Sequence, residues 1–320
     1  MTGKGEFGRI RDFLSPLAGE GAFDLTDDAA LIAEAPGQEL VVTTDTIIAG
    51  VHFMGDEDPS LIAAKLLRVS LSDLAAMGAT PAGYTLNWAL PVTCDDVWIE
   101  SFCRGLGEQQ TMFGLSLLGG DSVSGPGPVC LTATLFGRVP VGQALRRKGA
   151  AAGDSIYVSG TIGDGALGLL AAKGDLAGLD AVSMNALISR YRLPEPRLEV
   201  GQALRGKASA AADVSDGLLA DLGHIAAASG LGAEIEFAKI PLSAAAGAAL
   251  ESNEDLWRSV VTGGDDYELV FTGPLGLDVS LESVDINVTA IGRMTRDSGV
   301  SLLDVDGKSL HLEQTGYRHG

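Results

Sequence analysis

Short apolar runs and longer helix-like stretches alternate along most of the chain. The apolar runs predict strands, and the clearest of them alternates apolar and polar positions with period two; they lie at 40–43, 129–136, 155–159, 233–237, 268–272 and 286–291. Stretches of helical pattern, each ending close to a glycine or a turn, predict helices at 61–77, 97–113, 164–173 and 217–229. This order predicts a mixed α and β fold (α/β class) with sheets covered by helices.

The length of 320 residues, 46% of them hydrophobic, predicts two domains. A basic cluster at 146–148 is followed by five small residues at 149–153, which is typical of a linker. The predicted domains are therefore 1–148 and 149–320.

The charge and the cysteines exclude several classes of function. With 42 acidic and 22 basic residues the net charge is -20, so binding to nucleic acid is not expected. Cys94, Cys103 and Cys130 are odd in number and lack metal-type spacing, which predicts neither a disulfide framework nor a zinc site and favours the reducing cytoplasm. No apolar run approaches the roughly 20 residues of a membrane span, so no membrane insertion is expected.

Short acidic motifs occur in apolar or glycine-rich settings. Because an unpaired buried carboxylate is costly, several of these acids are expected to share a compensating cation. Magnesium prefers oxygen ligands and commonly bridges carboxylates and nucleotide phosphates, so a metal–nucleotide site is the first hypothesis. The motifs are Thr26-Asp27-Asp28, Thr43-Thr44-Asp45, Ser72-Asp73, Gly119-Gly120-Asp121, Asp213-Val214-Ser215-Asp216-Gly217 and Gly263-Gly264-Asp265-Asp266.

Each motif also has a plain structural alternative. Thr43-Thr44-Asp45 is placed at the end of a strand, where ligands collect, or Asp45 simply starts a turn. Asp73 lies in an apolar helix as a metal ligand, or as a buried acid paired with Arg68 or Lys65. The paired acids Asp27-Asp28 can cap a helix or a turn, and the glycine-rich motifs can be turns.

The common nucleotide motifs are weak or missing. The segment 163–168 matches G-x-G-x-x-G, but no second strand ending in an acid follows it. Neither a Walker A motif nor a kinase H-R-D loop is present. His52 is either structural or placed next to a phosphate.

Six stretches in order resemble the thiamine-monophosphate kinases, a family of the aminoimidazole ribonucleotide synthetase superfamily. They read TTDTIIAGVHF, VSLSDLAAMGATPAGYTLNWALP, LLGGDS, DVSDGLLADLGHIA, GGDDYEL and GYRH. The resemblance implies a two-domain fold of that superfamily, with N-terminal sheets that pair in a homodimer and a C-terminal α/β domain that completes the active site. It also implies transfer of the γ-phosphoryl group of ATP to thiamine monophosphate with several Mg²⁺ ions, giving thiamine diphosphate.

The same resemblance implies roles for individual residues. The implied metal ligands are Asp28, Thr43, Thr44, Asp45, Asp73, Asp121, Asp213 and Asp216. ATP phosphates would also meet Gly120, Asp121, Arg147 and Ser215, and the substrate would meet His52, Asp265 and Tyr317. Two positions depart from the family, which usually has glycine where this chain has Thr26 and glutamate where it has Asp265; the shorter acid reaches about one methylene less.

Phosphoryl transfer between two anions mainly needs alignment and neutralisation of charge. A group of carboxylates that holds magnesium can supply both. Because the attacking phosphate oxygen is already deprotonated near neutral pH, no general base is expected. The alternatives are another ATP-dependent enzyme of the superfamily, of cyclo-ligase, selenophosphate synthetase or hydrogenase-maturation type, and a non-catalytic acidic cation-binding protein.

Overall fold

The structure is a computed structural model that describes residues 4–281, 284–310, 312 and 315–317. The chain forms two compact units. Unit 1 comprises the residues through Leu74 together with Thr80–Gly142, and unit 2 comprises Ala75–Ala79 and the residues from Gln143 onward. The predicted division between residues 148 and 149 stays a prediction.

Unit 1 contains a four-stranded sheet of order β1-β4-β2-β3. The pairs β1–β4 and β4–β2 are antiparallel, whereas β2–β3 is parallel. The strands are β1 (Gln38–Ile48), β2 (Thr80–Leu90), β3 (Leu117–Ser124) and β4 (Cys130–Pro140). The predicted alternation in β4 is confirmed, since Leu131, Ala133, Leu135 and Val139 are buried and the residues between them are not, apart from Gly137.

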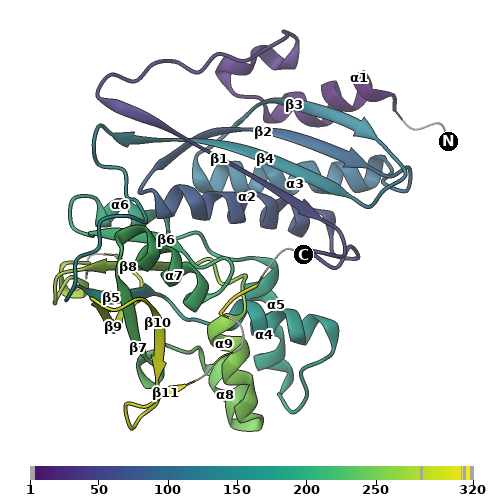
Figure 1. Ribbon diagram of the computed structural model, residues 1–320. Helices are drawn as coiled ribbons and strands as arrows, with labels where there is room; N and C mark the ends of the chain where they lie inside the picture. Colours follow the sequence, from purple (N-terminus) through teal and green to yellow (C-terminus); the bar gives the residue numbers. More distant parts are fainter. Residues whose placement is uncertain (1–3, 282–283, 311, 313–314, 318–320) are drawn as a thin grey trace. The chain divides into compact units, whose positions relative to one another are not determined.

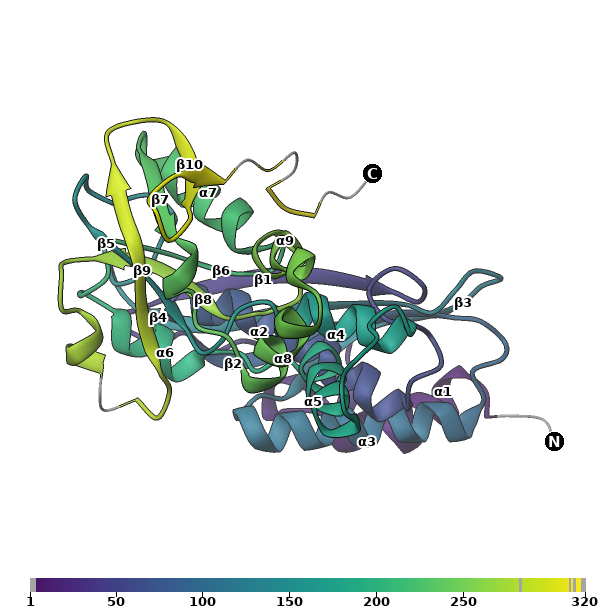
Figure 2. The ribbon, with the colours of Figure 1, turned by 90° about the horizontal axis from the view of Figure 1, so that it is seen from below.

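Two long helices, α2 (Pro59–Ala76) and α3 (Asp96–Phe113), cover one face of this sheet (Figures 1 and 2). Asp95 caps α3 by accepting a hydrogen bond from the backbone N–H of Trp98, and Gly114 ends the helix at φ 67°. The predicted helices at 61–77 and 97–113 are therefore confirmed with small changes of boundary.

A chain of short helices precedes the sheet: α1 (Glu6–Arg9), η1 (Ile10–Leu14), η2 (Ser15–Leu17) and η3 (Glu20–Leu25). Gly19 joins this N-terminal segment to β3, because its N–H donates to the carbonyl of Leu117 at 2.8 Å. The segment therefore lies against the edge of the sheet that β3 forms.

Unit 2 contains a seven-stranded sheet of order β11-β10-β7-β9-β5-β8-β6, in which only the β7–β10 pair is parallel among the described residues. Its strands are β5 (Ser155–Ser159), β6 (Ala210–Asp213), β7 (Gly232–Glu236), β8 (Leu269–Gly273), β9 (Val288–Thr295), β10 (Gly299–Leu303) and β11 (Ser309–Leu310). Its helices are α4 (Asp164–Lys173), α5 (Ala181–Arg192), α6 (Leu198–Leu204), α7 (Leu218–Ser229), α8 (Ala244–Ser252) and α9 (Trp257–Thr262), with short turns η4 (Phe237–Lys239), η5 (Glu254–Leu256) and η6 (Asp278–Leu281).

The sheet of unit 2 is buried on both faces. Ile156 and Val158 belong to one apolar cluster with residues of α4 and α7. Tyr157 and Phe271, whose rings stack at 5.5 Å, belong to a second cluster with residues of α6. Because successive side chains of β5 enter opposite clusters, the run Ser155–Ser159 is apolar almost throughout.

The predicted strand at 40–43 ends too early, because β1 continues through Asp45 to Ile48. Several elements were not predicted: strands β2, β3, β6, β10 and β11 and helices α1, α5, α6, α8 and α9. In β3, the sequence Gly119-Gly120-Asp121 has the composition of a turn, yet parallel pairing with β2 holds it extended. No helix in the described part of the chain is long and apolar enough to cross a membrane.

Candidate functional site

In unit 1, a strand and a helix bring Thr43, Asp45 and Asp73 together. Thr43 and Asp45 are half-buried residues of β1, and they alternate with the exposed residues Thr44 and Thr46. Asp73 lies in the last turns of α2, and its carboxylate accepts a hydrogen bond from the hydroxyl of Thr43. The structure thus places Asp73 beside other candidate ligands.

The two carboxylates of this group, Asp45 and Asp73, repel each other, which makes it harder to ionise both of them. Burial, and next the nearby charge of Asp73, raise the pKa of Asp45 from 3.8 to about 6, although Ser70 donates a hydrogen bond to it. The Oδ2 atom of Asp45 is buried and has no hydrogen-bond partner among the described residues. Such an oxygen beside a second carboxylate fits a hard divalent cation, which would supply the missing positive charge.

Thr43-Thr44-Asp45 does not lie at a strand end as predicted, because all three residues are in the interior of β1. The side chain of Thr44 points to the other face of the sheet, where its hydroxyl lies 3.0 Å from that of Thr134. Its side chain is thus separated from Asp45 and Asp73 by the pleat of the strand. The metal role of Thr44 stays a prediction that this side-chain position does not support.

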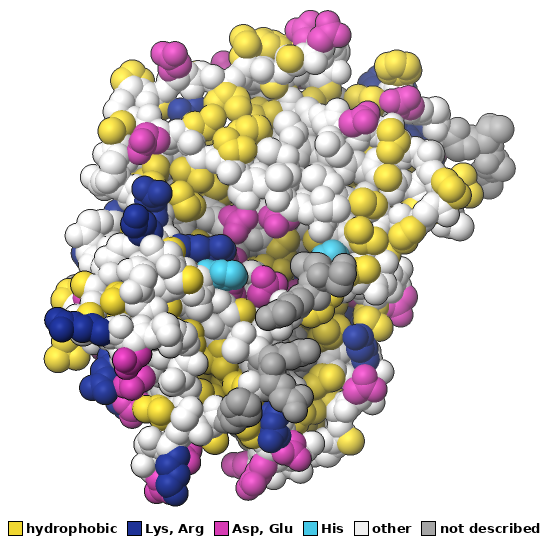
Figure 3. Space-filling view, viewed as in Figure 1, with side chains coloured by type: hydrophobic (Ala, Val, Ile, Leu, Met, Phe, Trp, Pro, Cys, Tyr) yellow, Lys and Arg dark blue, Asp and Glu magenta, His cyan; other side chains and the backbone are white. Residues whose placement is uncertain are grey.

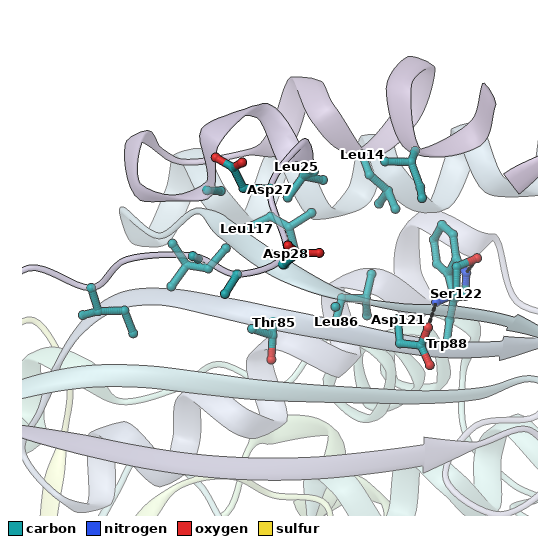
Figure 4. A pocket seen from close by; sticks show the side chains of 18 of the residues that line it. Leu14, Leu25, Asp27, Asp28, Thr85, Leu86, Trp88, Leu117, Asp121 and Ser122 are labelled. Atoms are coloured by element: carbon teal, nitrogen blue, oxygen red, sulfur yellow. Dashed lines mark hydrogen bonds between the residues drawn. The ribbon is translucent and has the colours of Figure 1, made fainter. Parts of the chain in front are cut away.

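A second part of unit 1 is a cavity of about 430 Å³ between the N-terminal segment and the sheet. Asp27 and Asp28 line it on the side of the N-terminal segment, and Thr85 and Asp121 line it on the side of strands β2 and β3 (Figure 4). Leu14, Leu25, Leu117 and Trp88 give the cavity an apolar wall. The cavity combines carboxylates with an apolar surface, a combination that suits a polar ligand with a flat ring system.

The backbone at Gly120 approaches β2 so closely that no side chain fits. A Cβ there would lie 1.7 Å from the carbonyl oxygen of Leu86, and the φ of Gly120 is 154°. The turn alternative for Gly119-Gly120-Asp121 is wrong, since these residues lie inside β3. Asp121 is exposed beside this bare backbone, and its Oδ1 accepts a hydrogen bond from the N–H of Ser122 at 2.9 Å.

Asp28 is also exposed and lies in a bend at residues 27–29. Just before this bend, the hydroxyl of Thr26 donates to the carbonyl of Phe23 at 2.7 Å. The structure brings Asp28, Gly120 and Asp121 to one cavity. Among the described residues, however, no three His, Cys, Asp or Glu side chains are grouped closely enough to hold a metal ion. The implied set of metal ligands therefore stays a prediction.

His52 lies in the turn after β1. Its Nδ1 accepts a hydrogen bond from the backbone N–H of Ile48 at 3.1 Å, and the backbone N–H of His52 donates to the carbonyl of Ile48 at 3.0 Å. These contacts support the structural alternative for His52, and its substrate role stays a prediction.

In unit 2, Asp213 ends β6, and the loop after it carries Ser215 and Asp216. A buried acid on α7 fixes this loop. The Oδ2 of Asp221 accepts hydrogen bonds from the backbone N–H groups of Ser215, Asp216 and Gly217 at 3.0 to 3.2 Å. Asp221 is 1% exposed, and burial raises its pKa to about 6. The sequence analysis did not identify Asp221, which sits five residues after Asp216 in an apolar helix.

A second loop, Gly263–Tyr267, packs against the first. The N–H of Asp265 donates to the carbonyl of Ser215 at 2.9 Å, and the N–H of Tyr267 donates to that of Val214 at 2.8 Å. The N–H of Tyr317 donates to the carbonyl of Asp216 at 2.9 Å. Within unit 2, the predicted residues Ser215, Asp216, Asp265 and Tyr317 are thus brought together; Arg318 and His319 of the GYRH motif lie outside the described residues.

Two further buried acids lie within and just after this second loop. The sequence analysis named Asp266 in the Gly-Gly-Asp-Asp motif without giving it a role, and it did not identify Glu268. Asp266 is 1% exposed and accepts hydrogen bonds from the N–H groups of Gly163 and Gly165. Burial raises the pKa of Asp266 to about 8, while these two donors act in the opposite direction. Glu268 is fully buried and is bound by Arg197, Arg190 and Ser159.

The G-x-G-x-x-G match at 163–168 is thereby explained. It follows β5 and opens α4, as in a dinucleotide site, but its two leading glycine N–H groups bind the carboxylate of Asp266. A carboxylate at this position leaves no room for a pyrophosphate.

Arg147 is exposed in the loop after β4. The positive charge of Arg147 acts to lower the pKa of Asp221, so Arg147 lies near the loop that holds Ser215.

Comparison with known proteins identifies the family. Residues 26–139 match the family model of the AIR synthase related protein N-terminal domain, and residues 151–304 match that of the C-terminal domain. The chain is 43% identical over 324 residues to the thiamine-monophosphate kinase of Caulobacter vibrioides, covering 98% of this chain and 91% of the relative. It is 44% identical over 297 residues to the thiamine-monophosphate kinase of Escherichia coli, covering 92% and 90%.

Solved structures give the same result. A thiamine-monophosphate kinase from Stenotrophomonas maltophilia superposes with a TM-score of 0.80 at 42% identity, covering 89% of this chain and 91% of that one. AaThiL complexed with AMPPCP and TMP superposes with a TM-score of 0.79 at 29% identity, covering 98% and 97%. The hydrogenase maturation protein HypE in complex with ATP has a TM-score of 0.78 at 19% identity over 98% of this chain and 96% of that one, which shows the shared fold alone. The chain belongs to the thiamine-monophosphate kinase family, built from the two domains of the AIR synthase-related proteins.

Proposed function

We propose that this chain transfers the γ-phosphoryl group of ATP to the phosphate of thiamine monophosphate, giving thiamine diphosphate and ADP, with Mg²⁺ as the metal. The observation that carries the proposal is the match of 98% of the chain to a relative described as complexed with AMPPCP, an ATP analogue, and TMP. The curated relatives at 43% and 44% identity carry the name of the same activity.

The first step is binding of nucleotide and metal by unit 1. Asp45 and Asp73 would hold magnesium, with the hydroxyl of Thr43 keeping the carboxylate of Asp73 in place. The backbone of Gly120, which lines the cavity, would meet a phosphate there. The apolar wall of the cavity would take the flat base, and Asp28 and Asp121 would add oxygen ligands.

Unit 2 would supply the remaining groups. Asp213 and Asp216 would add metal ligands, and Ser215 and Arg147 would meet phosphate oxygens. Asp265 and Tyr317 would contact the thiamine rings, and backbone hydrogen bonds tie both of them to the loop that carries Ser215 and Asp216. His52 in unit 1 is proposed near the phosphate of the substrate.

Bound magnesium would neutralise the charge that builds up on the transferring group and hold the two phosphates in line. The chain's own carboxylates would hold the magnesium, and its glycines and hydroxyls would contact the phosphates. None of these groups needs to remove a proton. The attacking oxygen of thiamine monophosphate is already ionised near neutral pH. A pH profile of kcat that requires an enzymatic base with a pKa near 7 would contradict this point.

A homodimer formed through unit 1 is also proposed. Strand β1 is an edge of its sheet, and its outward side chains Leu40 and Val42 are 49% and 55% exposed. Yellow hydrophobic side chains are visible among white ones on the surface of unit 1 in Figure 3. Apolar residues on an edge strand support pairing with a second copy.

The proposed location is the cytoplasm, in keeping with the three free thiols of Cys94, Cys103 and Cys130.

The proposal is tested by incubating the purified chain with ATP and thiamine monophosphate and quantifying thiamine diphosphate by liquid chromatography. The expected product requires Mg²⁺, disappears with excess EDTA and does not form when thiamine replaces its monophosphate. Metal binding without any nucleotide turnover would instead identify a non-catalytic cation-binding protein and would overturn the proposal.

A further inference from the structure

Four residues of the loop Gly263–Tyr267 in unit 2, Gly264–Tyr267, have an unusual backbone conformation and are called the turn below. Asp265 has a φ of 70° and Tyr267 a φ of 53°, so two side chains with a Cβ are held in the left-handed region. Outside the N-terminal segment, they are the only described non-glycine residues with positive φ. Such a conformation costs free energy and persists only where neighbouring contacts impose it, often at functional sites.

Asp266, the residue between these two, supplies the contacts that impose it. Its Oδ2 accepts the N–H of Gly163 at 2.7 Å, and its Oδ1 accepts the N–H of Gly165 at 2.8 Å. Both donors belong to the start of α4, where backbone N–H groups lack partners within the helix. Asp266 thereby fastens the turn to a rigid element more than 100 residues away in sequence.

The backbone around this fastening is packed without free space. A Cβ on Gly165 would lie 2.3 Å from the carbonyl carbon and oxygen of Asp265, and a Cβ on Gly264 would lie 2.2 Å from the carbonyl oxygen of Ser215. The turn is thus enclosed between α4 and the loop after β6. A displacement of Asp266 would therefore move the backbone of Asp265 directly.

The chain just beyond the turn is also fixed. Glu268 receives two hydrogen bonds from Arg197, both at 2.6 Å, and one from Arg190 at 3.0 Å. Asp265 is consequently held at a defined place between two buried anchors, Asp266 and Glu268. Of the acids in this segment, Asp265 alone is partly exposed.

We propose that Asp266 is a positioning residue for the acceptor substrate: it holds Asp265 in its left-handed conformation, so that the Asp265 carboxylate can meet thiamine monophosphate. This inference rests on the proposed function, in which Asp265 contacts the substrate. The side chain of Asp266 is buried and itself touches no substrate.

The chemistry predicts why a carboxyl group is needed here. Each oxygen of Asp266 serves one N–H donor, and either oxygen of a carboxyl group can accept. An asparagine can accept at only one atom, and its NH₂ group would face an N–H group of α4. Asp266→Asn keeps the size of the side chain and removes one of the two bonds.

The test is the steady-state kinetics of Asp266→Asn with both substrates varied. We expect the KM for thiamine monophosphate to rise about tenfold or more and the KM for ATP to change less than about twofold. Asp180→Asn is a matched control, because Asp180 accepts the N–H groups of Val182 and Ser183 at the start of α5. This control should lower thermal stability and leave both KM values unchanged.

A double-mutant cycle separates positioning from general stability. In an Asp265→Ala background, Asp266→Asn should change the KM for thiamine monophosphate less than about twofold, since the group to be positioned is already absent. Equal effects in both backgrounds, or equal effects on the two KM values, would overturn the inference.

If Asp266→Asn does not fold, Gly165→Ala displaces the Asp265–Asp266 peptide from the side of α4 and should give the same selective, non-additive rise in KM. Gly247→Ala in α8 is its control, because a Cβ there meets nothing within 4 Å. A Gly165→Ala enzyme with unchanged KM for thiamine monophosphate would overturn the inference. A wild-type chain that makes no thiamine diphosphate would refute the proposed function and this inference with it, whereas an active wild type with a non-selective variant would refute only the inference.

Discussion

Removal of the Asp73 charge should abolish activity and yet stabilise the metal-free protein. Asp73→Asn keeps an oxygen that can accept the hydrogen bond from the hydroxyl of Thr43, so the contact between β1 and α2 is preserved. It removes a negative charge next to the buried carboxylate of Asp45. Without metal, the two carboxylates repel each other, and the variant relieves that repulsion.

The magnitude follows from the pKa of Asp45, which folding raises from 3.8 to about 6. Each pH unit corresponds to about 1.4 kcal/mol, so ionised Asp45 costs the metal-free fold about 3 kcal/mol above pH 6. Burial is the larger cause and Asp73 the next, so Asp73→Asn should recover at most about 1.5 kcal/mol. Because the pKa of Asp45 is higher in the folded than in the unfolded protein, ionisation of Asp45 destabilises the fold progressively as the pH rises from about 4 to about 6. The stability gained by Asp73→Asn should therefore be absent near pH 4 and complete above about pH 6.

The assay is urea denaturation of both proteins in EDTA at about pH 7.5, together with formation of thiamine diphosphate in excess Mg²⁺. We expect a free energy of unfolding equal to or above that of the wild type, and activity lower by a factor of about 100 or more. A variant that loses more than about 1 kcal/mol without metal, or that keeps wild-type activity, would refute the reasoning.

Asp58→Asn is the matched control in the same unit. Asp58 lies immediately before α2, is exposed and accepts hydrogen bonds from the N–H and hydroxyl of Ser60 and from the hydroxyl of Ser101, which hold the pKa of its carboxyl below the usual value. The same substitution should therefore lower stability here and leave activity unchanged. The opposite signs at two acids of one unit separate relief of repulsion from a general effect of lost charge.

Three further changes test other parts of the account. Gly120→Ala should lower the free energy of unfolding by about 2 kcal/mol or more and abolish product formation, because the new Cβ would meet the carbonyl of Leu86. Gly119→Ala is the control, because a Cβ at Gly119 meets nothing within 4 Å; it should leave stability unchanged in the same denaturation experiment. Glu268→Gln should cost about 3 kcal/mol by leaving two partly buried arginines without their buried counter-charge, and a loss below about 1 kcal/mol would contradict the role given to that network. Val42→Asp should convert the proposed dimer to a folded monomer in light scattering; a wild type that is itself monomeric, or a variant that stays dimeric, would contradict the proposed interface.

The parts of the fold that the sequence predicted well have strong local signals. Ser155–Ser159 and Asp164–Lys173 agree with the predicted strand and helix to the residue, because an unbroken apolar run and a helix between two glycines leave little choice of boundary. Strand β3 was missed because Gly119-Gly120-Asp121 has turn composition, and only its parallel pairing with β2 makes it extended. Long-range pairing of this kind leaves no mark in a local pattern.

The candidate site divides in the same way. The sequence pointed to Asp45 and Asp73 through their apolar surroundings, and the structure shows that they lie near each other between β1 and α2 in unit 1. Asp221 and the anchoring role of Asp266 were missed because the partners of both acids are backbone N–H groups, which every sequence contains. For Asp266 those donors come from α4, about 100 residues earlier in the chain, so only the folded structure reveals that the second acid of Gly-Gly-Asp-Asp is a buried anchor.

The central claim is transfer of the γ-phosphoryl group of ATP to the phosphate of thiamine monophosphate, and an isotope experiment tests this claim. ATP carrying ¹⁸O on its non-bridging γ-oxygens is incubated with the chain, Mg²⁺ and unlabelled thiamine monophosphate, and the products are analysed by mass spectrometry. The account predicts that all of the label appears in the terminal phosphate of thiamine diphosphate and none in ADP. Labelled inorganic phosphate without labelled thiamine diphosphate would contradict it.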